Sequence, residues 1–361
     1  MAHIQLKNIS KTFGNHHALK GLNLEIADGE FFVLLGETGA GKTTTLRLVA
    51  GLEKPTEGQI FIDGVDVAEW GAAERDVALV LQQYSLYPRY TVRENLEFPL
   101  KPKIRRVDDA EIKARVAKVA KTLRIEHLLD RKTDRLSGGE MQRVSIGRAI
   151  VRSPRVFLMD EPLSALDAKL REALRTELKN LQMNLGATFL FVTHDQIEAM
   201  SMGDKIGVLN NGQLIQTGTP NEIYNNPLNI FVARSVGTPP MNLFDGTLNG
   251  GRAVVTPTRF ELPYAGAVSA GTSATERPLV FGIRPEDIVL ESGAPVQAKV
   301  HDVENHGVEK IITLRVEEML LRATASAQTN LQRDEDVRFG WNQDKVAVFD
   351  QKTGTSLRHH A

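Results

Sequence analysis

The sequence of 361 residues predicts an α/β domain with a largely parallel sheet, followed by a smaller all-β domain. Up to about residue 236, short apolar runs alternate with helical stretches, which is typical of a parallel sheet covered by helices. One of these runs leads through a glycine-rich loop into a helix. After Gly237, short apolar stretches are separated by turn residues, which indicates an all-β domain. We therefore predict a boundary at residues 236–240, with domains at 1–236 and 237–361.

The first domain shows its elements in a regular order. IQLKNIS alternates like a half-buried strand, whereas FFVLL, VALVL, VFLMD and TFLFVT have the length and composition of buried strands. Helices are predicted for DDAEIKARVAKVAKTL and for AKLREALRTELKNLQMNLG, which ends at Gly186. KIGVLNNGQLIQTG predicts a hairpin that turns at Asn211 and Gly212, and Pro220 with Glu222 predicts a further helix start. In the second domain, strands are predicted for RAVVT, PLVFGI, QAKVHDV, IITLRV and KVAVF.

Composition excludes several classes of protein. The net charge of −1 argues against a broad surface for nucleic acid. There is no cysteine, hence no disulfide or thiol chemistry, and the start MAHIQLKNIS lacks the pattern of a secretory signal. No apolar stretch approaches the roughly 20 residues that span a bilayer. If the protein acts at a membrane, we expect it to bind at one face without crossing the bilayer.

The loop GETGAGKTT satisfies the P-loop pattern G-x-x-x-x-G-K-[ST] between a buried strand and a helix. Backbone N–H groups in such a loop surround phosphate oxygens, the lysine supplies a positive charge and the threonine hydroxyl binds Mg²⁺. An ordinary glycine turn before a helix is the competing interpretation, and the context disfavours it. We expect the nucleotide to be held by Gly36, Glu37, Thr38, Gly39, Ala40, Gly41, Lys42, Thr43 and Thr44.

Two further motifs carry candidate chemistry. VFLMDEP ends a buried strand in two carboxylates. Asp160 is a candidate ligand of Mg²⁺, and Glu161 is a candidate to polarise an attacking water. Alone, this pattern is as typical of a solvated strand end. DRLSGGEMQRVSIGRAI places a serine and two glycines at the start of a helix, where free N–H groups attract an anion. Alone, it is more typical of a plain helix cap, so the chain presents a second anion site whose purpose the residues leave open.

Taken together, these motifs identify a family. LSGGEMQRVSIGRAI resembles the signature motif of ATP-binding cassette (ABC) ATPases, and the P-loop, VFLMDEP, SALD and FVTHD follow the family's order over residues 1 to about 236. The resemblance implies an ABC ATPase cassette, a P-loop NTPase fold with a helical subdomain, and Mg-ATP as substrate. It also implies a dimer in which the signature turn of one protomer caps the ATP of the other. That arrangement would explain two anion sites in one chain.

The resemblance assigns a role to each matching residue. Glu161 falls at the general base, His194 at the switch histidine that contacts the γ-phosphate, and Lys42 at the P-loop lysine. Thr43, Gln82 and Asp160 fall at the metal site. The remaining nucleotide contacts that the resemblance implies are Phe13, which stacks on adenine, Gln82, Asp167 and the partner's turn of Ser137, Gly138, Gly139 and Glu140.

A narrower resemblance concerns transport. QQYSLYPRYTVRENL, DEPLSALDAKLR and VTHDQIEAM resemble the ATPases of carbohydrate and glycerol-3-phosphate importers, and GTPPMNLFDG and FGIRPEDI resemble their C-terminal OB-like (TOBE) regulatory domain. This implies a peripheral protein on the cytoplasmic face of the inner membrane. Its partners would be a second ATPase protomer, identical or different, two transmembrane permease subunits and, through them, an extracytoplasmic solute-binding protein. No nucleic acid is expected.

Several alternatives stay open. One alternative function is a cassette that acts mainly as a regulator-binding switch rather than as an importer ATPase. One alternative assembly is a heteromeric pair of ATPases rather than a homodimer. An ABC ATPase of DNA repair or of the ribosome is disfavoured because the chain has neither long coiled coils nor a second cassette. Tyr84, Leu86 and Tyr87 suit a partner helix and local packing about equally. Glu140 replaces the family's usual glutamine, Phe13 its usual tyrosine or tryptophan, and the terminal RHHA is interpreted as a disordered end rather than a metal site.

Overall fold

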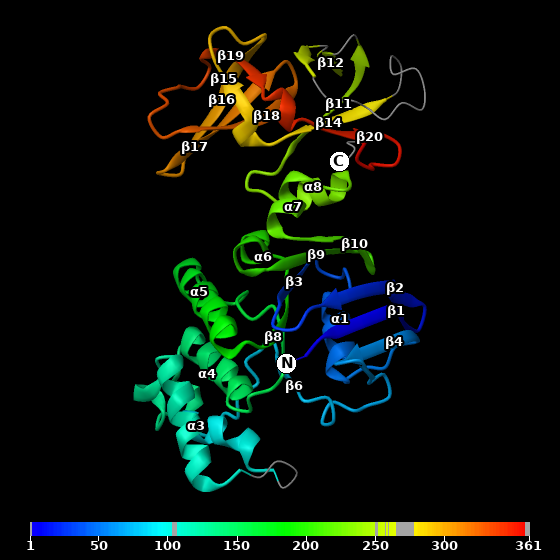
Figure 1. Ribbon diagram of the computed structural model, residues 1–361. Helices are drawn as coiled ribbons and strands as arrows, with labels where there is room; N and C mark the ends of the chain where they lie inside the picture. Colours follow the sequence, from blue (N-terminus) through cyan, green and yellow to red (C-terminus); the bar gives the residue numbers. More distant parts are fainter. Residues whose placement is uncertain are drawn as a thin grey trace. The chain divides into compact units, whose positions relative to one another are not determined.

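The computed structural model describes residues 2–102, 107–249, 252–256, 258, 260–264 and 278–357 (Figure 1). The chain divides into two compact units, Met1–Pro220 and Asn221–Ala361, and each is described by itself. The boundary predicted at 236–240 lies after the two short helices that follow the division at residue 220. It stays a prediction. The histidines of the terminal RHHA lie outside the described residues.

A six-stranded sheet forms the centre of the first unit, in the order β10-β9-β3-β8-β7-β6. The neighbours from β9 to β6 pair in parallel, and β10 joins the edge in antiparallel orientation through the hairpin at Asn211 and Gly212. Both turn residues have positive φ, as a two-residue hairpin requires. The parallel sheet expected from the sequence is therefore confirmed. Its strands are β3 (Phe31–Leu35), β6 (Val77–Val80), β7 (Val156–Asp160), β8 (Thr188–Thr193), β9 (Lys205–Asn210) and β10 (Gln213–Gly218).

The central strands are apolar because both faces of the sheet are covered. Every residue of β3, β7 and β8 is buried. Phe31, Phe157 and Phe189 stack across these strands, with ring centroids 5.2 and 4.7 Å apart. Burial of such side chains contributes about 2 kcal/mol each. The rigid platform that results holds the ends of the strands in place.

A second, antiparallel sheet follows the order β2-β1-β4-β5. Only β1, which contains IQLKNIS, was predicted from the sequence. Along β2 the buried residues alternate with exposed ones, as expected for a sheet with one solvated face. The strands are β1 (Ile4–Phe13), β2 (His16–Ile26), β4 (Glu57–Ile62) and β5 (Val65–Asp66).

Six α-helices are described in the first unit up to residue 202. Three of them, α2, α3 and α4, contact one another and form a helical subdomain, seen in Figure 1 around α3 and α4. α3 begins after the capping carboxylate of Asp108, and α5 ends at Gly186 with φ 58°, so both predicted helices are confirmed. The helices are α1 (Lys42–Ala50), α2 (Val92–Glu97), α3 (Asp109–Thr122), α4 (Gly138–Ile150), α5 (Ala168–Leu185) and α6 (Gln196–Met202).

The second unit contains two antiparallel five-stranded sheets, in the orders β13-β12-β11-β14-β20 and β15-β19-β16-β17-β18. Their inner faces share one apolar core, which includes Phe244, Phe281, Phe339 and Trp341. Two short helices, α7 (Pro220–Asn225) and α8 (Ile230–Ser235), precede the strands. The strands are β11 (Asn242–Asn249), β12 (Arg252–Val255), β13 (Glu261–Pro263), β14 (Leu279–Ile283), β15 (Ile288–Leu290), β16 (Val296–Asn305), β17 (Glu309–Val316), β18 (Met319–Ser326), β19 (Asp336–Trp341) and β20 (Ala347–Asp350).

Candidate nucleotide site

Four adjacent parallel strands deliver the candidate residues to one edge of the central sheet. The P-loop follows β3, His194 follows β8, Asp160 ends β7 and Gln82 follows β6. The register aligns these ends, since Leu35 pairs with Thr193 and Asp160 pairs with Val192. Ligands of open α/β sheets bind beyond the carboxyl ends of the strands. Residues that are distant in the sequence are therefore brought to one site by sheet order.

The P-loop backbone needs glycine at two positions for separate reasons. A Cβ on Gly36 would lie 2.5 Å from the Leu209 carbonyl oxygen, and Gly41 has φ 109° where the loop enters α1. No side chain caps the N-terminus of α1, so the N–H groups of its first turn have no side-chain acceptor. Such a helix start attracts phosphate. Glu37, Thr38 and Gly39 are exposed along the loop, Thr44 is half-buried and Ala40 is buried.

Three ionisable side chains converge beside the P-loop. The Lys42 ammonium is 5% exposed and lies 3.3 Å from Glu161 Oε1, and it also donates to the carbonyl oxygens of Gly36 and Glu37. His194 Nδ1 lies 2.9 Å from Glu161 Oε2. Glu161 thus lies between a cation and an imidazole, which suits a carboxylate that accepts a proton from water.

Asp160 and Thr43 form a pair of oxygen ligands. Thr43 Oγ1 donates to Asp160 Oδ1 across 3.0 Å. Burial raises the pKa of the Asp160 carboxyl above its usual range, and the hydrogen bond from Thr43 partly opposes this shift. A divalent cation would reverse the shift by favouring the charged carboxylate. Hydroxyl and carboxylate oxygens are the donors that Mg²⁺ prefers.

Gln82 and Asp167 lie at the margins of this cluster. Gln82 Nε2 donates to Ser164 Oγ, and Ser164 Oγ donates to the Glu161 carbonyl oxygen. The loop after β6 is therefore tied to the backbone of Glu161 rather than to Thr43. Asp167 caps α5 by accepting from the Leu170 N–H.

Ser137, Gly138, Gly139 and Glu140 begin α4 as a separate turn. Ser137 is the helix cap, and Glu140 completes a capping box with it. A Cβ on Gly139 would overlap the Leu170 side chain of α5, so this turn packs tightly on the helix after Asp167. Within the described ranges, no hydrogen bond or ion pair joins this turn to the P-loop. The turn is therefore not fixed to the P-loop by polar contacts.

Phe13 ends β1 with an exposed ring, 43% accessible to solvent. Lys11 Nζ lies 4.7 Å from the centre of this ring, and it is itself held by Glu53 Oε2 at 2.9 Å. Attraction between the cation and the ring helps to hold the ring in place. Lys11 was not among the residues predicted from the sequence.

Arg171 is a second residue that sequence reasoning missed. It donates to the carbonyl oxygen of Leu166, just before Asp167, and pairs with Asp195, just after His194. Asp195 also caps α6 by accepting from two backbone N–H groups. The arginine therefore links the turn at Asp167 to the loop of His194. The D-x-x-E spacing after His194 could have indicated the cap, but nothing in the sequence indicated the arginine.

Comparison with known proteins agrees with this geometry. Family models described as ABC transporter, MalK OB fold domain and TOBE domain match residues 19–164, 237–288 and 281–349. The trehalose/maltose import ATP-binding protein MalK of Thermococcus litoralis is 44% identical over 383 residues, which cover 99% of this chain and 100% of that protein. This chain belongs to the ATP-binding subunits of the ABC transporter family.

Two further members extend the comparison. The sn-glycerol-3-phosphate import ATP-binding protein UgpC of Brucella abortus is 45% identical, with 97% of both chains covered. A dimeric ATP-binding cassette in a post-hydrolysis state, bound to ADP and Pi, has a TM-score of 0.55 and 35% identity. The match covers 60% of this chain and 98% of that cassette.

These similarities confirm the predicted ABC ATPase cassette with a C-terminal OB-like domain, and ATP as its nucleotide. Across the described residues, no helix of this ABC ATPase has the length and apolar character needed to cross a bilayer.

Proposed function

We propose that this chain hydrolyses Mg-ATP to energise an importer of a sugar, polyol or glycerol phosphate. Relatives named for import of trehalose or maltose and of sn-glycerol-3-phosphate support the solute class. The observation that carries the enzymatic part is the contact of Glu161 with both Lys42 and His194 at the mouth of the P-loop.

Hydrolysis would use each of these side chains differently. Glu161 accepts the proton of the attacking water, and His194, held through Nδ1, turns its other ring nitrogen toward the γ-phosphate. Lys42 exchanges its contact with Glu161 for the β- and γ-phosphate oxygens. This exchange would free the Glu161 carboxylate when the nucleotide binds. A positioned base of this kind contributes about 10²- to 10⁴-fold in rate.

Mg²⁺ would be held by Thr43 and Asp160, whose oxygen atoms already lie together, with phosphate oxygens and water completing its shell. The metal supplies charge neutralisation at the phosphates. Gln82, now bonded to Ser164, would reach this shell after a change of rotamer. Phe13 would stack on the adenine.

The functional form would be a dimer of ATPases, because the turn of Ser137, Gly138, Gly139 and Glu140 is not joined to the P-loop of its own chain. In our proposal this turn and Asp167 approach the nucleotide of the second protomer. The dimeric cassette bound to ADP and Pi supports the assembly. Homodimer and heteromeric pair both satisfy this requirement.

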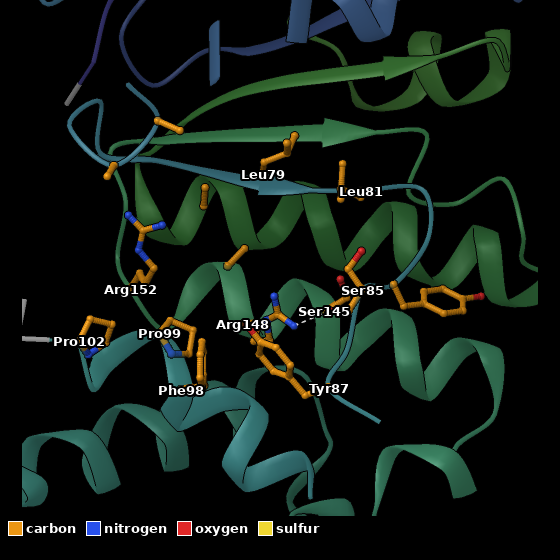
Figure 2. A pocket seen from close by; sticks show the side chains of 15 residues that line it. Leu79, Leu81, Ser85, Tyr87, Phe98, Pro99, Pro102, Ser145, Arg148 and Arg152 are labelled. Atoms are coloured by element: carbon orange, nitrogen blue, oxygen red, sulfur yellow. Dashed lines mark hydrogen bonds between the residues drawn. The ribbon is translucent and has the colours of Figure 1, made fainter. Parts of the chain in front are cut away.

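A cavity beside the Gln82 loop suits the permease. It has a volume of about 390 Å³, and its walls carry Leu79, Tyr87, Phe98 and Arg148 (Figure 2). The rings of Tyr87 and Phe98 are 4.5 Å apart and both are partly exposed. We expect an apolar permease helix to enter here, on the cytoplasmic face of the inner membrane. A solute-binding protein would deliver cargo to the permease from outside.

The first test is the substitution Glu161→Gln in the full chain with its permease. We expect ATP binding to persist and hydrolysis to fall by about 10²- to 10⁴-fold, measured as phosphate release and nucleotide filter binding. Glu57→Gln, at an exposed strand position, is the matched control and should hydrolyse normally. Normal hydrolysis by the Glu161 variant, or no magnesium-dependent hydrolysis by the parent, would refute the proposal.

A further inference from the structure

The signature turn contains its own anion. The Glu140 carboxylate Oε2 accepts hydrogen bonds from the Ser137 backbone N–H at 2.7 Å and from the Ser137 hydroxyl at 3.0 Å. Under the proposed function, Ser137 is the residue that meets the γ-phosphate of the partner protomer. The donors that would bind phosphate are thus already bonded to a carboxylate of the same chain.

The charge on this carboxylate is stable at neutral pH. The Ser137 N–H lowers the pKa of Glu140 most strongly among the favourable contacts, and Arg131 and His127 lower it further. Arg131 Nη1 lies 3.6 Å from Oε1, with a side chain that is 45% exposed. A solvated arginine on one side compensates the negative charge only partly.

Helix capping alone does not require this charge. A glutamine at the third helical position also completes a capping box. The chain offers an internal comparison at α2, where Glu94 Oε2 accepts from the Thr91 N–H at 2.7 Å and from the Thr91 hydroxyl at 3.0 Å. The two boxes have the same geometry, but only the box at Ser137 lies in the signature turn.

We propose that the negative charge of Glu140 lowers the nucleotide affinity of the composite site by repelling the incoming triphosphate. A glutamine would accept the same hydrogen bond from the Ser137 N–H without this charge, so closure with Glu140 needs a higher ATP concentration. The inference rests on the proposed function, since it needs the turn to face the partner's nucleotide.

The experiment compares two charge-neutralising substitutions in the full-length Glu161→Gln chain, which retains its nucleotide. Sedimentation velocity at graded Mg-ATP concentrations measures dimer formation. We expect Glu140→Gln to lower the ATP concentration for half-maximal dimerisation by about tenfold, the scale of one charge contact near a protein surface. Glu94→Gln should leave it unchanged. Because salt screens charges, the Glu140 effect should shrink as ionic strength rises to about 1 M.

The outcomes separate the two proposals. A dimer that forms with ATP at the same concentration in the Glu140→Gln and parent forms overturns the role of Glu140 but leaves the composite site intact. An equal shift in Glu94→Gln also overturns it, because the effect would then belong to charge in general. Absence of any ATP-dependent dimer, both with this chain alone and with a second, different ATPase of the same transporter, refutes the composite site and this inference together. Thermal unfolding of both glutamine variants at the same temperature as the parent chain verifies that both helix caps survive.

Discussion

Glu161 shows how a single residue is held for chemistry. Its backbone has φ 43°, a left-handed conformation that is uncommon outside glycine. The N–H of Glu161 donates to the Val192 carbonyl oxygen, which ties the turn to the neighbouring strand. Such backbone strain persists only where surrounding contacts enforce it, and it is frequent at functional sites. Here the strain aims the carboxylate at Lys42 and His194.

Glu198 is a buried carboxyl whose ionisation acts against folding. It is 2% exposed, and burial raises its pKa above the ordinary 4.5, although Thr193 donates to it. The pKa of Glu198 is higher in the folded than in the unfolded chain. Its contribution to stability is therefore complete at a pH below the unfolded-state pKa and is lost as pH rises through the folded-state pKa.

We therefore predict that Glu198→Gln, which stays neutral, gains free energy of unfolding over the parent chain as pH rises from about 4 to about 8. Urea unfolding followed by Trp70 fluorescence, in a Trp341→Phe background, measures the difference. Exposed Glu57→Gln should show no such trend. If the difference in free energy of unfolding between Glu198→Gln and the parent shrinks as pH rises, the raised pKa of Glu198 is contradicted.

At the scale of elements, α4 and α5 meet where Gly139 contacts Leu170. A Cβ at Gly139 would overlap the Leu170 side chain. We predict that Gly139→Ala lowers the free energy of unfolding by about 1–3 kcal/mol, the usual cost of overpacking. Adding Leu170→Ala should recover part of this loss. Thermal unfolding of the single and double variants tests the pair, and simple additivity of their effects would argue against the contact.

A buried arginine holds α7 and α8 against the sheets of the second unit. Arg284 is 4% exposed and donates to the carbonyl oxygens of Ala233, Val236 and Tyr224. Its guanidinium also lies 3.9 Å from the Tyr224 ring centre. These contacts explain the arginine of FGIRPEDI as a structural residue.

We predict that Arg284→Ala destabilises this unit by about 3 kcal/mol or more, because two buried carbonyl groups and one part-buried one lose their donor. Hydrogen exchange of residues 221–236 should accelerate accordingly. Exposed Arg322→Ala serves as the control and should leave exchange unchanged. If the hydrogen exchange of residues 221–236 is unchanged in the Arg284 variant, the structural role of Arg284 is refuted.

At the scale of the whole molecule, the proposed coupling runs from the cavity to the catalytic base. Arg148 Nη1 donates to the Ser85 carbonyl oxygen, and Gln82, in the same loop, contacts Ser164. A permease helix seated in the cavity would therefore touch the loop that is bonded to the backbone of Glu161. Such docking would give transport a physical route to hydrolysis.

We predict that Tyr87→Ala combined with Phe98→Ala weakens permease binding at least tenfold, because loss of two partly buried rings removes several kcal/mol of apolar contact. Co-purification with detergent-solubilised permease measures the effect. Trp70→Ala, an exposed aromatic that does not line the cavity, is the control. Equal loss in both variants, or none, would exclude the cavity as the docking site.

Most of the fold was predictable because its signals are local. The apolar runs of β3, β7 and β8, the cap of α3 and the glycine stop of α5 all depend on neighbouring residues. Strands β2 and β4 were missed since their pairing partners, not their own composition, make them strands. Arg171 was missed for the same reason, because only folding brings it near Asp195. Lys11 lies only two residues before Phe13, so its contact with that ring is local and was overlooked.

The sequence by itself determined the P-loop, the order of the cassette motifs and the change to an all-β domain, since each is written in residue type and short spacing. Only the folded structure shows that Glu161 is the carboxylate that meets Lys42 and that Gln82 contacts Ser164. Those facts depend on strand order and on rotamers. Long-range packing determines both, and spacing along the chain does not encode them directly.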